Sequence, residues 1–469
     1  MAVFLADLHT ASAVLTTWTY KQGTSGLLWS DPNAWTTGEV PTPGQDTVLR
    51  FNMSSSSLSG TNNLGSFQLN EVLVSGGNTK GWTMAANGGS LNFVTNSDGG
   101  LPSIVATNVF SFTFAIPILV TDHLSVTSSG AGGLSFNDKG TITNNGGFSV
   151  ETTSGATGGV AFNGNITNNS DFKTIANGGG ISITAAQFTN NGTITISGAN
   201  GTSFTKVISG TGSVTVEAGS KASLSGSSSF SGGVTVNDGV NLSIGHNKAL
   251  GSGTVTLKGG TISSGTSTTG YTVANVINIT GERPVVFGDA VKSGTMTYSG
   301  AVTIGDNATV STASETIFTG AIAAGNNVTF DLTAANSNLT LNSLDISNGV
   351  TVKLDLDAGS LLTLTGGLTN ATGGLLTFDL SGSSIVAGQT YRLIGFGSTT
   401  LTMADLNLLG LDPAYQLDTT YGTNGWSVTG SELDIQFAQM VPEPGTWAML
   451  VGGLGMLLGF QRVRRQKNS

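Results

Sequence analysis

Apolar side chains recur in short alternating pairs through the middle of the chain. The pairs are Ile194/Ile196, Val214/Val216, Val234/Val236 and Val255/Leu257. Successive pairs are 20, 20 and 21 residues apart, with Gly, Ser and Asn between them. Because side chains alternate between the two faces of a strand, each pair predicts a short strand with two inward side chains.

A second repeat runs at a similar period. Its copies are Ile142-Thr143-Asn144-Asn145-Gly146, Ile166-Thr167-Asn168-Asn169-Ser170 and Phe188-Thr189-Asn190-Asn191-Gly192, at spacings of 24 and 22 residues. A period of this length predicts one coil of a stacked solenoid. We therefore expect an all-β protein, a right-handed parallel β-helix over residues 51–437. An antiparallel sandwich also gives regularly spaced strands, but a phase kept over four successive units favours the solenoid.

Composition supports this class. Gly accounts for 69 of 469 residues and charged residues for only 9%, while 38% of the chain is hydrophobic. Such a chain is too apolar for a disordered one and can bury a core with few ion pairs. Thr, Val and Ile favour strands, and Gly and Asn favour turns.

Aromatic residues gather near the start of the chain. The stretch 18–50 contains Trp18-Thr19-Tyr20, Trp29 to Trp35 and the turn sequence Pro43-Gly44. The open end of a solenoid core has to be covered, so this stretch predicts an N-terminal aromatic cap. A small aromatic cluster without that role is the alternative.

Residues 208–265 resemble a known repeat. The strings Ile208-Ser209-Gly210-Thr211-Gly212-Ser213-Val214, Phe230-Ser231-Gly232-Gly233-Val234 and Ala249-Leu250-Gly251-Ser252-Gly253-Thr254-Val255 are similar to the autotransporter-associated β-strand repeat. The aromatic stretch resembles the start of proteins that carry such repeats. The resemblance implies a β-solenoid with a structural or adhesin-like role at the cell surface.

The C-terminal segment 438–469 has three parts in order. Pro442, Glu443 and Pro444 come first, and an apolar run follows from Gly445 to Phe460. The basic residues Arg462, Arg464, Arg465 and Lys467 come last. The run predicts a short transmembrane-type helix with a basic stop, although its 16 residues would span only about 24 Å of a roughly 30 Å hydrocarbon core.

This order of parts resembles the PEP-CTERM sorting signal of Gram-negative bacteria. The resemblance implies that an exosortase-type enzyme recognises Pro442, Glu443 and Pro444 and removes the tail, and that the protein contacts the membrane through the tail until then. An ordinary terminal anchor is the alternative. Both interpretations place the body of the protein in the cell envelope, at the cell surface or in the extracellular matrix.

The first 17 residues are less regular. Ala11-Ser12-Ala13 fits a small-residue cleavage site, but no basic residue precedes it and Asp7 interrupts the apolar stretch. We expect a remnant of a signal peptide, because a sorting tail requires prior export. An irregular lead-in is the alternative.

Charge and chemistry restrict the function further. All 27 acidic residues lie in residues 1–461, against 13 basic ones, and this argues against a nucleic-acid partner. Cys is absent, and the three histidines, His9, His123 and His246, are too few for a His-rich metal centre.

Several polar residues are candidates for chemistry. Asp355 and Asp357 share one face of an expected strand and could act as a carboxylate pair, but a solvated face opposite Leu354 and Leu356 is favoured. Glu282-Arg283-Pro284, Asp306 and His246 are expected in turns. We therefore predict no catalytic residue, cofactor or metal.

The sequence thus predicts an exported structural or adhesin-like solenoid, not an enzyme. Its expected partners are the processing enzyme and extracellular polysaccharide. The alternative is a β-helix enzyme that acts on polysaccharide, which a cleft with three or more convergent charged groups would favour. A carbohydrate-binding module would need an exposed aromatic strip.

Overall fold

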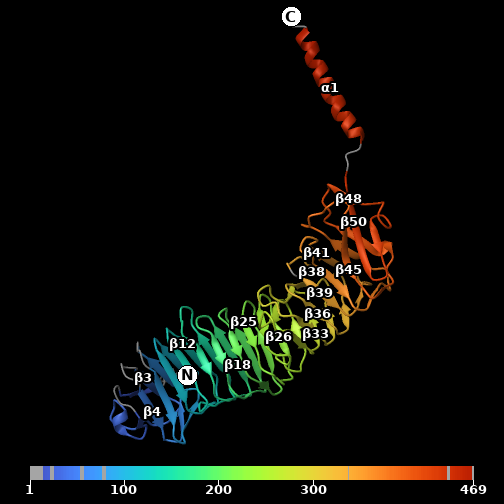
Figure 1. Ribbon diagram of the computed structural model, residues 1–469. Helices are drawn as coiled ribbons and strands as arrows, with labels where there is room; N and C mark the ends of the chain where they lie inside the picture. Colours follow the sequence, from blue (N-terminus) through green and yellow to red (C-terminus); the bar gives the residue numbers. More distant parts are fainter. Residues whose placement is uncertain are drawn as a thin grey trace, which may run out of the picture.

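The protein is an elongated, gently curved rod of stacked coils (Figure 1). The computed structural model describes residues 14–21, 26–52, 58–76, 81–335, 337–440 and 444–466. Most of the expected signal-peptide remnant, residues 1–13, lies outside the described residues. Through most of the rod a coil contributes one strand to each of three faces, and the next coil repeats them in the same direction.

The first face is a 14-stranded parallel sheet, which a short three-stranded sheet follows. Its strands are β1 (Thr16–Tyr20), β3 (Thr47–Asn52), β6 (Glu71–Ser75), β9 (Ser103–Thr107), β12 (Leu124–Ser129), β15 (Phe148–Thr152), β18 (Asp171–Ala176), β21 (Thr193–Ser197), β24 (Ser213–Val216), β26 (Val234–Val236), β28 (Val255–Leu257), β31 (Ile277–Ile279), β34 (Val302–Ile304) and β37 (Ile322–Ala324). The short sheet contains β40 (Leu344–Asp345), β43 (Gly367–Thr369) and β46 (Ser398–Thr399).

The second face is a parallel ladder that runs along almost the whole rod. Its strands are β2 (Leu27–Leu28), β4 (Leu58–Asn62), β7 (Trp82–Ala86), β10 (Ser111–Ala115), β13 (Gly133–Phe136), β16 (Val160–Phe162), β19 (Ile181–Ile183), β22 (Thr202–Phe204), β25 (Lys221–Leu224), β27 (Asn241–Ile244), β29 (Gly260–Ser264), β32 (Val285–Phe287), β35 (Thr309–Thr312), β38 (Val328–Leu332), β41 (Val350–Leu354), β44 (Leu376–Asp379) and β47 (Leu406–Leu409).

The third face consists of two sheets in succession. The first contains β5 (Ser66–Leu69), β8 (Ser90–Phe93), β11 (Ile118–Val120), β14 (Ile142–Asn144), β17 (Ile166–Asn168), β20 (Phe188–Asn190) and β23 (Ile208–Ser209). The second contains β30 (Tyr271–Val273), β33 (Met296–Tyr298), β36 (Thr316–Phe318), β39 (Asn338–Leu341), β42 (Leu361–Leu364) and β45 (Thr390–Gly395), followed by β50 (Glu432–Gln439) with β48 (Tyr415–Leu417) and β49 (Trp426–Val428). Two short 3₁₀ turns are η1 (Pro32–Ala34) and η2 (Met403–Asp405), and the one helix of the described residues is α1 (Pro444–Gln466).

The spacing of the sequence repeat equals the number of residues in one coil. Ile194 pairs with Val214, Val214 with Val234, and Val234 with Val255, all in parallel strands. Each of these side chains is buried at 1% exposure or less, so like residues stack in the core. The predicted parallel solenoid is confirmed, and the antiparallel sandwich is excluded for these coils.

The glycines of the repeat permit close stacking at one corner. A Cβ on Gly232 would lie 2.6 Å from the backbone carbonyl of Gly212, one coil earlier. A Cβ on Gly253 would likewise meet the backbone of Gly233. Glycine two residues before the apolar strand is therefore a packing requirement of this corner.

A ladder of buried asparagines stabilises another corner. Asn144 donates to Asn168 at 2.7 Å, and Asn168 donates to Asn190 at 2.8 Å, with all three side chains fully buried. The exposed neighbours Asn145, Asn169 and Asn191 form a second, outer ladder. The repeated Thr-Asn-Asn sequence therefore gives one amide to the core and one to the surface in each coil.

Aromatic rings fill the N-terminal end of the core. Trp29, Trp35 and Phe51 are buried, and the Trp35 indole donates to the Trp29 carbonyl at 3.0 Å. The rings of Trp29 and Trp35 meet edge to face with centroids 5.8 Å apart. Strands β1 and β3 from this stretch already pair in parallel, so the aromatic segment is itself the first coil of the rod.

The C-terminal end of the rod is closed differently. Strand β50 pairs antiparallel with β45, β48 and β49, and Trp426 packs on Phe378 with ring centroids 6.0 Å apart. Parallel stacking therefore stops before residue 437, where the sequence predicted that the repeats end. The antiparallel strands occupy the edge on which another coil would otherwise add.

Helix α1 occupies the expected position after the solenoid (Figure 1). In the described part of the chain, however, no helix is both long and apolar enough to cross a membrane. The transmembrane character expected of this helix is therefore not met. The apolar run has only 16 residues before the polar and basic last turn of the helix, whereas a helix needs about 20 apolar residues to span a bilayer.

Candidate functional site

Only the last residue of the expected sorting motif is described. Pro444 is the first residue of the helix, whereas Pro442 and Glu443 lie outside the described residues. Of the basic residues, Arg462 and Arg464 are exposed on the helix, Arg465 belongs to its last turn, and Lys467 lies outside the described residues.

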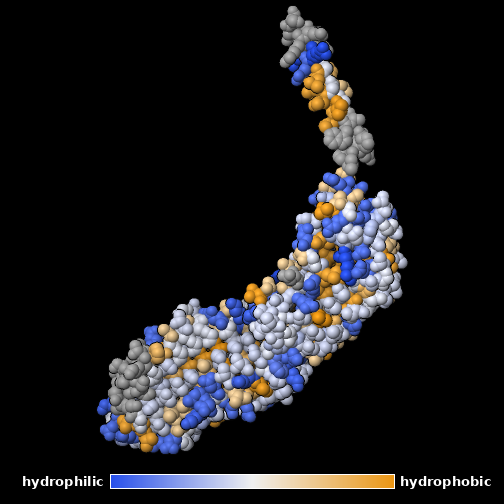
Figure 2. All heavy atoms as spheres, viewed as in Figure 1, coloured by the Kyte–Doolittle hydropathy of each residue, from blue (hydrophilic) through white to orange (hydrophobic). Residues whose placement is uncertain are grey.

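The apolar side chains of α1 are exposed. They include Met449 at 80% and Phe460 at 74% exposure, and Figure 2 shows them as an apolar surface on a helix that stands apart from the rod. The described part of the solenoid therefore does not cover these side chains.

The candidate carboxylate pair does not lie on a strand face. Strand β41 ends at Leu354, and Asp355 and Asp357 lie in the turn that follows. The Asp355 carboxylate accepts the backbone N–H of Asp357 at 3.0 Å, and the Asp357 carboxylate accepts the backbone N–H of Ser384 at 2.8 Å. The prediction of a shared strand face was wrong, because the alternating pattern continued past the end of the strand.

The remaining candidates serve as turn residues. His246 accepts the backbone N–H of Lys248 at 3.0 Å, and the Asp306 carboxylate accepts the backbone N–H and the side-chain amide of Asn326. These hydrogen bonds lower the pKa of Asp306. Arg283 lies 3.6 Å from Asp238 in an exposed ion pair. Within the described ranges, no three His, Asp or Glu side chains come close enough together to hold a metal ion.

A concave surface lies on the second face of the rod. It runs over β19, β22, β25 and β27, has a volume of about 580 Å³, and is lined by Gly180, Ile181, Ser182, Asn200, Gly201, Thr202, Ser203, Lys221, Ala222, Ser223, Asn241, Ser243 and Lys292. A second depression of about 310 Å³ shares Gly180 and Ser182 with it and continues over β16, β13 and β10. We call the two together the serine groove.

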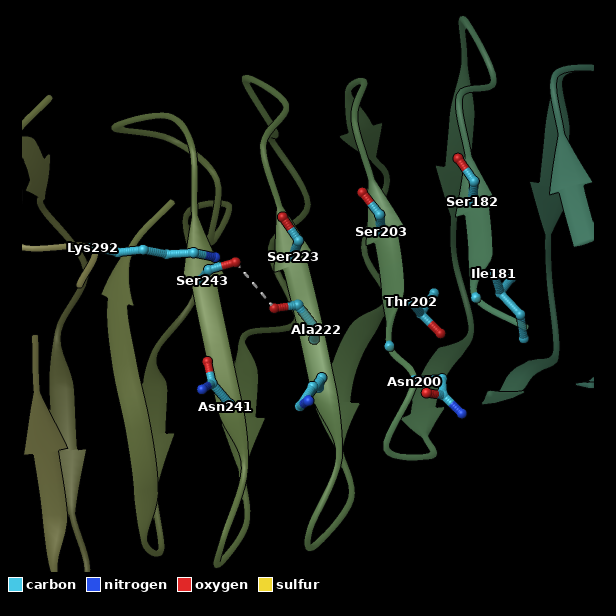
Figure 3. Close-up of a pocket in the computed structure, with 13 residues that line it drawn as sticks. Ile181, Ser182, Asn200, Thr202, Ser203, Ala222, Ser223, Asn241, Ser243 and Lys292 are labelled. Carbon is cyan, nitrogen blue, oxygen red and sulfur yellow. Dashed lines mark hydrogen bonds between the residues drawn. The ribbon is translucent and has the colours of Figure 1, made fainter. Parts of the chain in front are cut away.

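A row of serines forms the floor of the larger depression of the serine groove. Ser182, Ser203, Ser223 and Ser243 pair in register on successive strands, and Figure 3 shows their side chains on the same side of the sheet. Neighbouring strands lie about 4.8 Å apart, so the hydroxyls repeat at that interval. Within the described residues, the hydroxyls of Ser182 and Ser203 make no hydrogen bond, whereas that of Ser243 donates to the Ala222 carbonyl at 3.5 Å.

Glycines run beside the serines. Gly133, Gly159, Gly180 and Gly201 come from successive coils and line the same surface. A Cβ on Gly159 would lie 2.5 Å from the Gly180 carbonyl oxygen, so the close stacking of the coils requires glycine there. The absence of these side chains leaves the groove shallow, with its backbone within reach of a ligand.

Two lysines mark the end of the groove nearer the C-terminus. Lys221 begins strand β25, and Lys292 extends from the loop after β32 toward Ser243 (Figure 3). Asp289 holds this loop by accepting the backbone N–H groups of Lys292 and Val291 at 2.9 and 2.8 Å. The same two hydrogen bonds lower the pKa of Asp289.

The groove has a definite charge. The 13 residues that line the larger depression include no acidic side chain, and neither do those that line the second depression. The chain as a whole, by contrast, carries a net charge of −10. The two salt bridges among the described residues are Arg283–Asp238 and Arg392–Glu432, so Lys221 and Lys292 are not engaged in one. The arrangement offers hydroxyl and amide groups together with two cations.

Sequence reasoning missed this groove. The inward pairs predict the strands, but the outward residue between them, such as Ser203 or Ser223, also recurs from coil to coil. That signal was present at the same spacing of 20 to 21 residues. Lys292 carried no such signal, because a loop brings it back over an earlier coil.

No family model, curated protein or solved structure matches the chain in the comparisons with known proteins.

Proposed function

We propose that the protein is an exported structural or adhesin-like rod of a bacterial cell surface or extracellular matrix. The observation that supports this most is the continuous polar surface of the coils. On the first face, Thr195, Thr215, Thr235 and Thr256 pair in register between buried apolar neighbours. On the third face, Thr143, Thr167 and Thr189 do the same.

Such a surface suits a scaffold. It presents the same uncharged groups repeatedly along a rigid axis, so many weak contacts can add up along one molecule. An enzyme that cleaves polysaccharide by acid–base catalysis needs a few convergent titratable groups, such as a pair of carboxylates. The serine groove is lined by serines, amides and two lysines, without a carboxylate. We therefore favour a scaffold over an enzyme.

The tail fits this role as a sorting signal. By its resemblance to PEP-CTERM segments, we take Pro442, Glu443 and Pro444 as the recognition motif of an exosortase-type enzyme in a Gram-negative envelope. The exposed apolar side chains of α1 would contact the membrane until the tail is removed. We also take the coil to be right-handed, because connections between parallel strands of one sheet are right-handed in nearly all proteins.

Deletion of the gene in the native host tests the role. The mutant should lose surface-exposed protein and form less cohesive matrix or attach less, and the full chain should restore both. A matched variant, Glu443→Ala, keeps the entire solenoid and should fail to restore surface exposure. Unchanged attachment and cohesion in the deletion strain would contradict the scaffold role, and full surface exposure of Glu443→Ala would contradict the sorting role.

A further inference from the structure

The serine groove has the features of a binding site for an extended polymer. From β10 to β27 it crosses six strand-to-strand steps, roughly 29 Å at about 4.8 Å per step. It is open along its length, and small side chains follow one another in register on its floor, from Thr113, Ser135 and Ala161 to the four serines Ser182, Ser203, Ser223 and Ser243. A compact ligand would use only a fraction of such a surface.

We propose that the serine groove binds a linear, acidic polysaccharide along the rod axis, with a carboxylate of the polymer between Lys221 and Lys292. The unpaired hydroxyls of Ser182 and Ser203 and the amide of Asn241 can bond to sugar hydroxyls. The repeat of the serines is close to the length that one pyranose ring adds to an extended chain, so successive sugars can make equivalent contacts.

The charges decide the class of ligand. Among the described residues neither lysine forms a salt bridge, and the residues that line the groove include no acidic side chain on an otherwise acidic protein. Such a site attracts an anion, and its two cations lie at one end of a floor that is otherwise uncharged. A nucleic acid carries a phosphate on every nucleotide and needs a continuous basic surface. An acidic polysaccharide can hydrogen-bond to the hydroxyl-rich floor through its sugars and place one carboxylate at the two lysines, with its other carboxylates in solvent.

Lys292 is held in position for this role. The loop that carries Lys292 is hydrogen-bonded to the preceding coil, because the backbone N–H of Gly294 donates to the Thr266 carbonyl at 3.3 Å. Asp289 fixes the start of the loop through two backbone hydrogen bonds. These backbone hydrogen bonds hold the loop that carries Lys292 at one end of the groove.

The inference rests on the proposed function for the source of the polymer, but binding can be tested without it. Purified full-length protein is titrated with alginate, with the neutral polymer dextran and with single-stranded DNA, and the affinities are compared. Alginate should bind most tightly, and added salt should weaken its binding. Equal binding of dextran and alginate, or tighter binding of DNA, would overturn the proposal.

Two variants locate the site. Lys221→Gln combined with Lys292→Gln should lower alginate affinity about three- to tenfold, as expected for two partly exposed ion pairs. Ser203→Met, which fills the floor and keeps both charges, should also lower it. The control Lys173→Gln removes an exposed strand lysine from the first face and should leave affinity unchanged.

The outcomes separate this inference from the proposed function. Thermal unfolding of each variant shows whether the fold is intact. Affinity that is insensitive to both groove variants, in folded protein, would overturn the groove as the site. Alginate binding by a protein that is not exported in its host would leave the groove proposal in place and contradict the surface role.

Discussion

The side-chain amide of Asn168 donates to the Asn190 side chain of the next coil at 2.8 Å, and both residues are fully buried. Asn168 also accepts from Asn144 at 2.7 Å, so each amide satisfies the next one along the rod. Polar groups this deep in a protein are tolerated only when they are paired. The ladder therefore fixes the register of these coils.

The buried ladder predicts a large cost for its interruption. Asn168→Ala would leave the Asn144 donor and the Asn190 acceptor without their partner, at about 1–3 kcal/mol for each buried polar group left unpaired. The matched control is the next residue, Asn169, whose amide belongs to the exposed ladder. Asn169→Ala should change stability by about 0.5 kcal/mol or less. Denaturant unfolding measures both, and equal effects would contradict the account of the corner.

The glycine corner makes a steric prediction. Gly232→Ala places a methyl group 2.6 Å from the Gly212 carbonyl, so the coils have to separate locally. We expect a loss of about 1–3 kcal/mol, typical of overpacking. The control Gly430→Ala has no atom within 4 Å of the added methyl and no unusual backbone angle. It should be close to neutral, and a neutral Gly232→Ala would show that the coils do not stack this closely.

Two tyrosines should respond in opposite directions to loss of the hydroxyl. The Tyr298 hydroxyl is buried and has no hydrogen-bond partner in the described structure, and burial raises its pKa. Tyr298→Phe should therefore be neutral or stabilising by about 1 kcal/mol. The Tyr391 hydroxyl accepts the Val386 N–H at 2.8 Å, so Tyr391→Phe should cost about 1 kcal/mol. A shift in the same direction for both in thermal unfolding would contradict this difference.

Acid should weaken the turns of the C-terminal half. The Asp379 carboxylate accepts the Ser381 hydroxyl at 2.6 Å and the Ser381 N–H at 3.0 Å, and these bonds, the hydroxyl first, lower its pKa below the usual 3.8. A lowered folded-state pKa favours the ionised form. Its stabilisation is therefore present above the usual pKa and is lost as the pH falls below it.

The variant Asp379→Asn tests this turn. It should be less stable than the wild type at neutral pH and should lose less stability between about pH 5 and about pH 3. Ser381→Ala removes the strongest donor to the carboxylate and should have the same effect. Acid profiles of melting temperature that coincide with the wild type for both variants would contradict the account.

The sequence predicted the fold better than the site. The spacing of Val214, Val234 and Val255 predicts coil stacking directly, because each coil repeats the same inward pair. The antiparallel closure by β50 carries no such period, since its partners β45, β48 and β49 differ in sequence and lie at unequal distances along the chain. That Lys221 and Lys292 line one depression depends on the fold of a loop, which no local pattern encodes.

The most direct test of the surface role is the intact mass of the protein from each fraction of its native host. The account predicts protein in the surface or matrix fraction that lacks everything after about Pro444. A full-length protein that keeps α1, or one found in the cytoplasmic fraction, would contradict export and sorting by the tail.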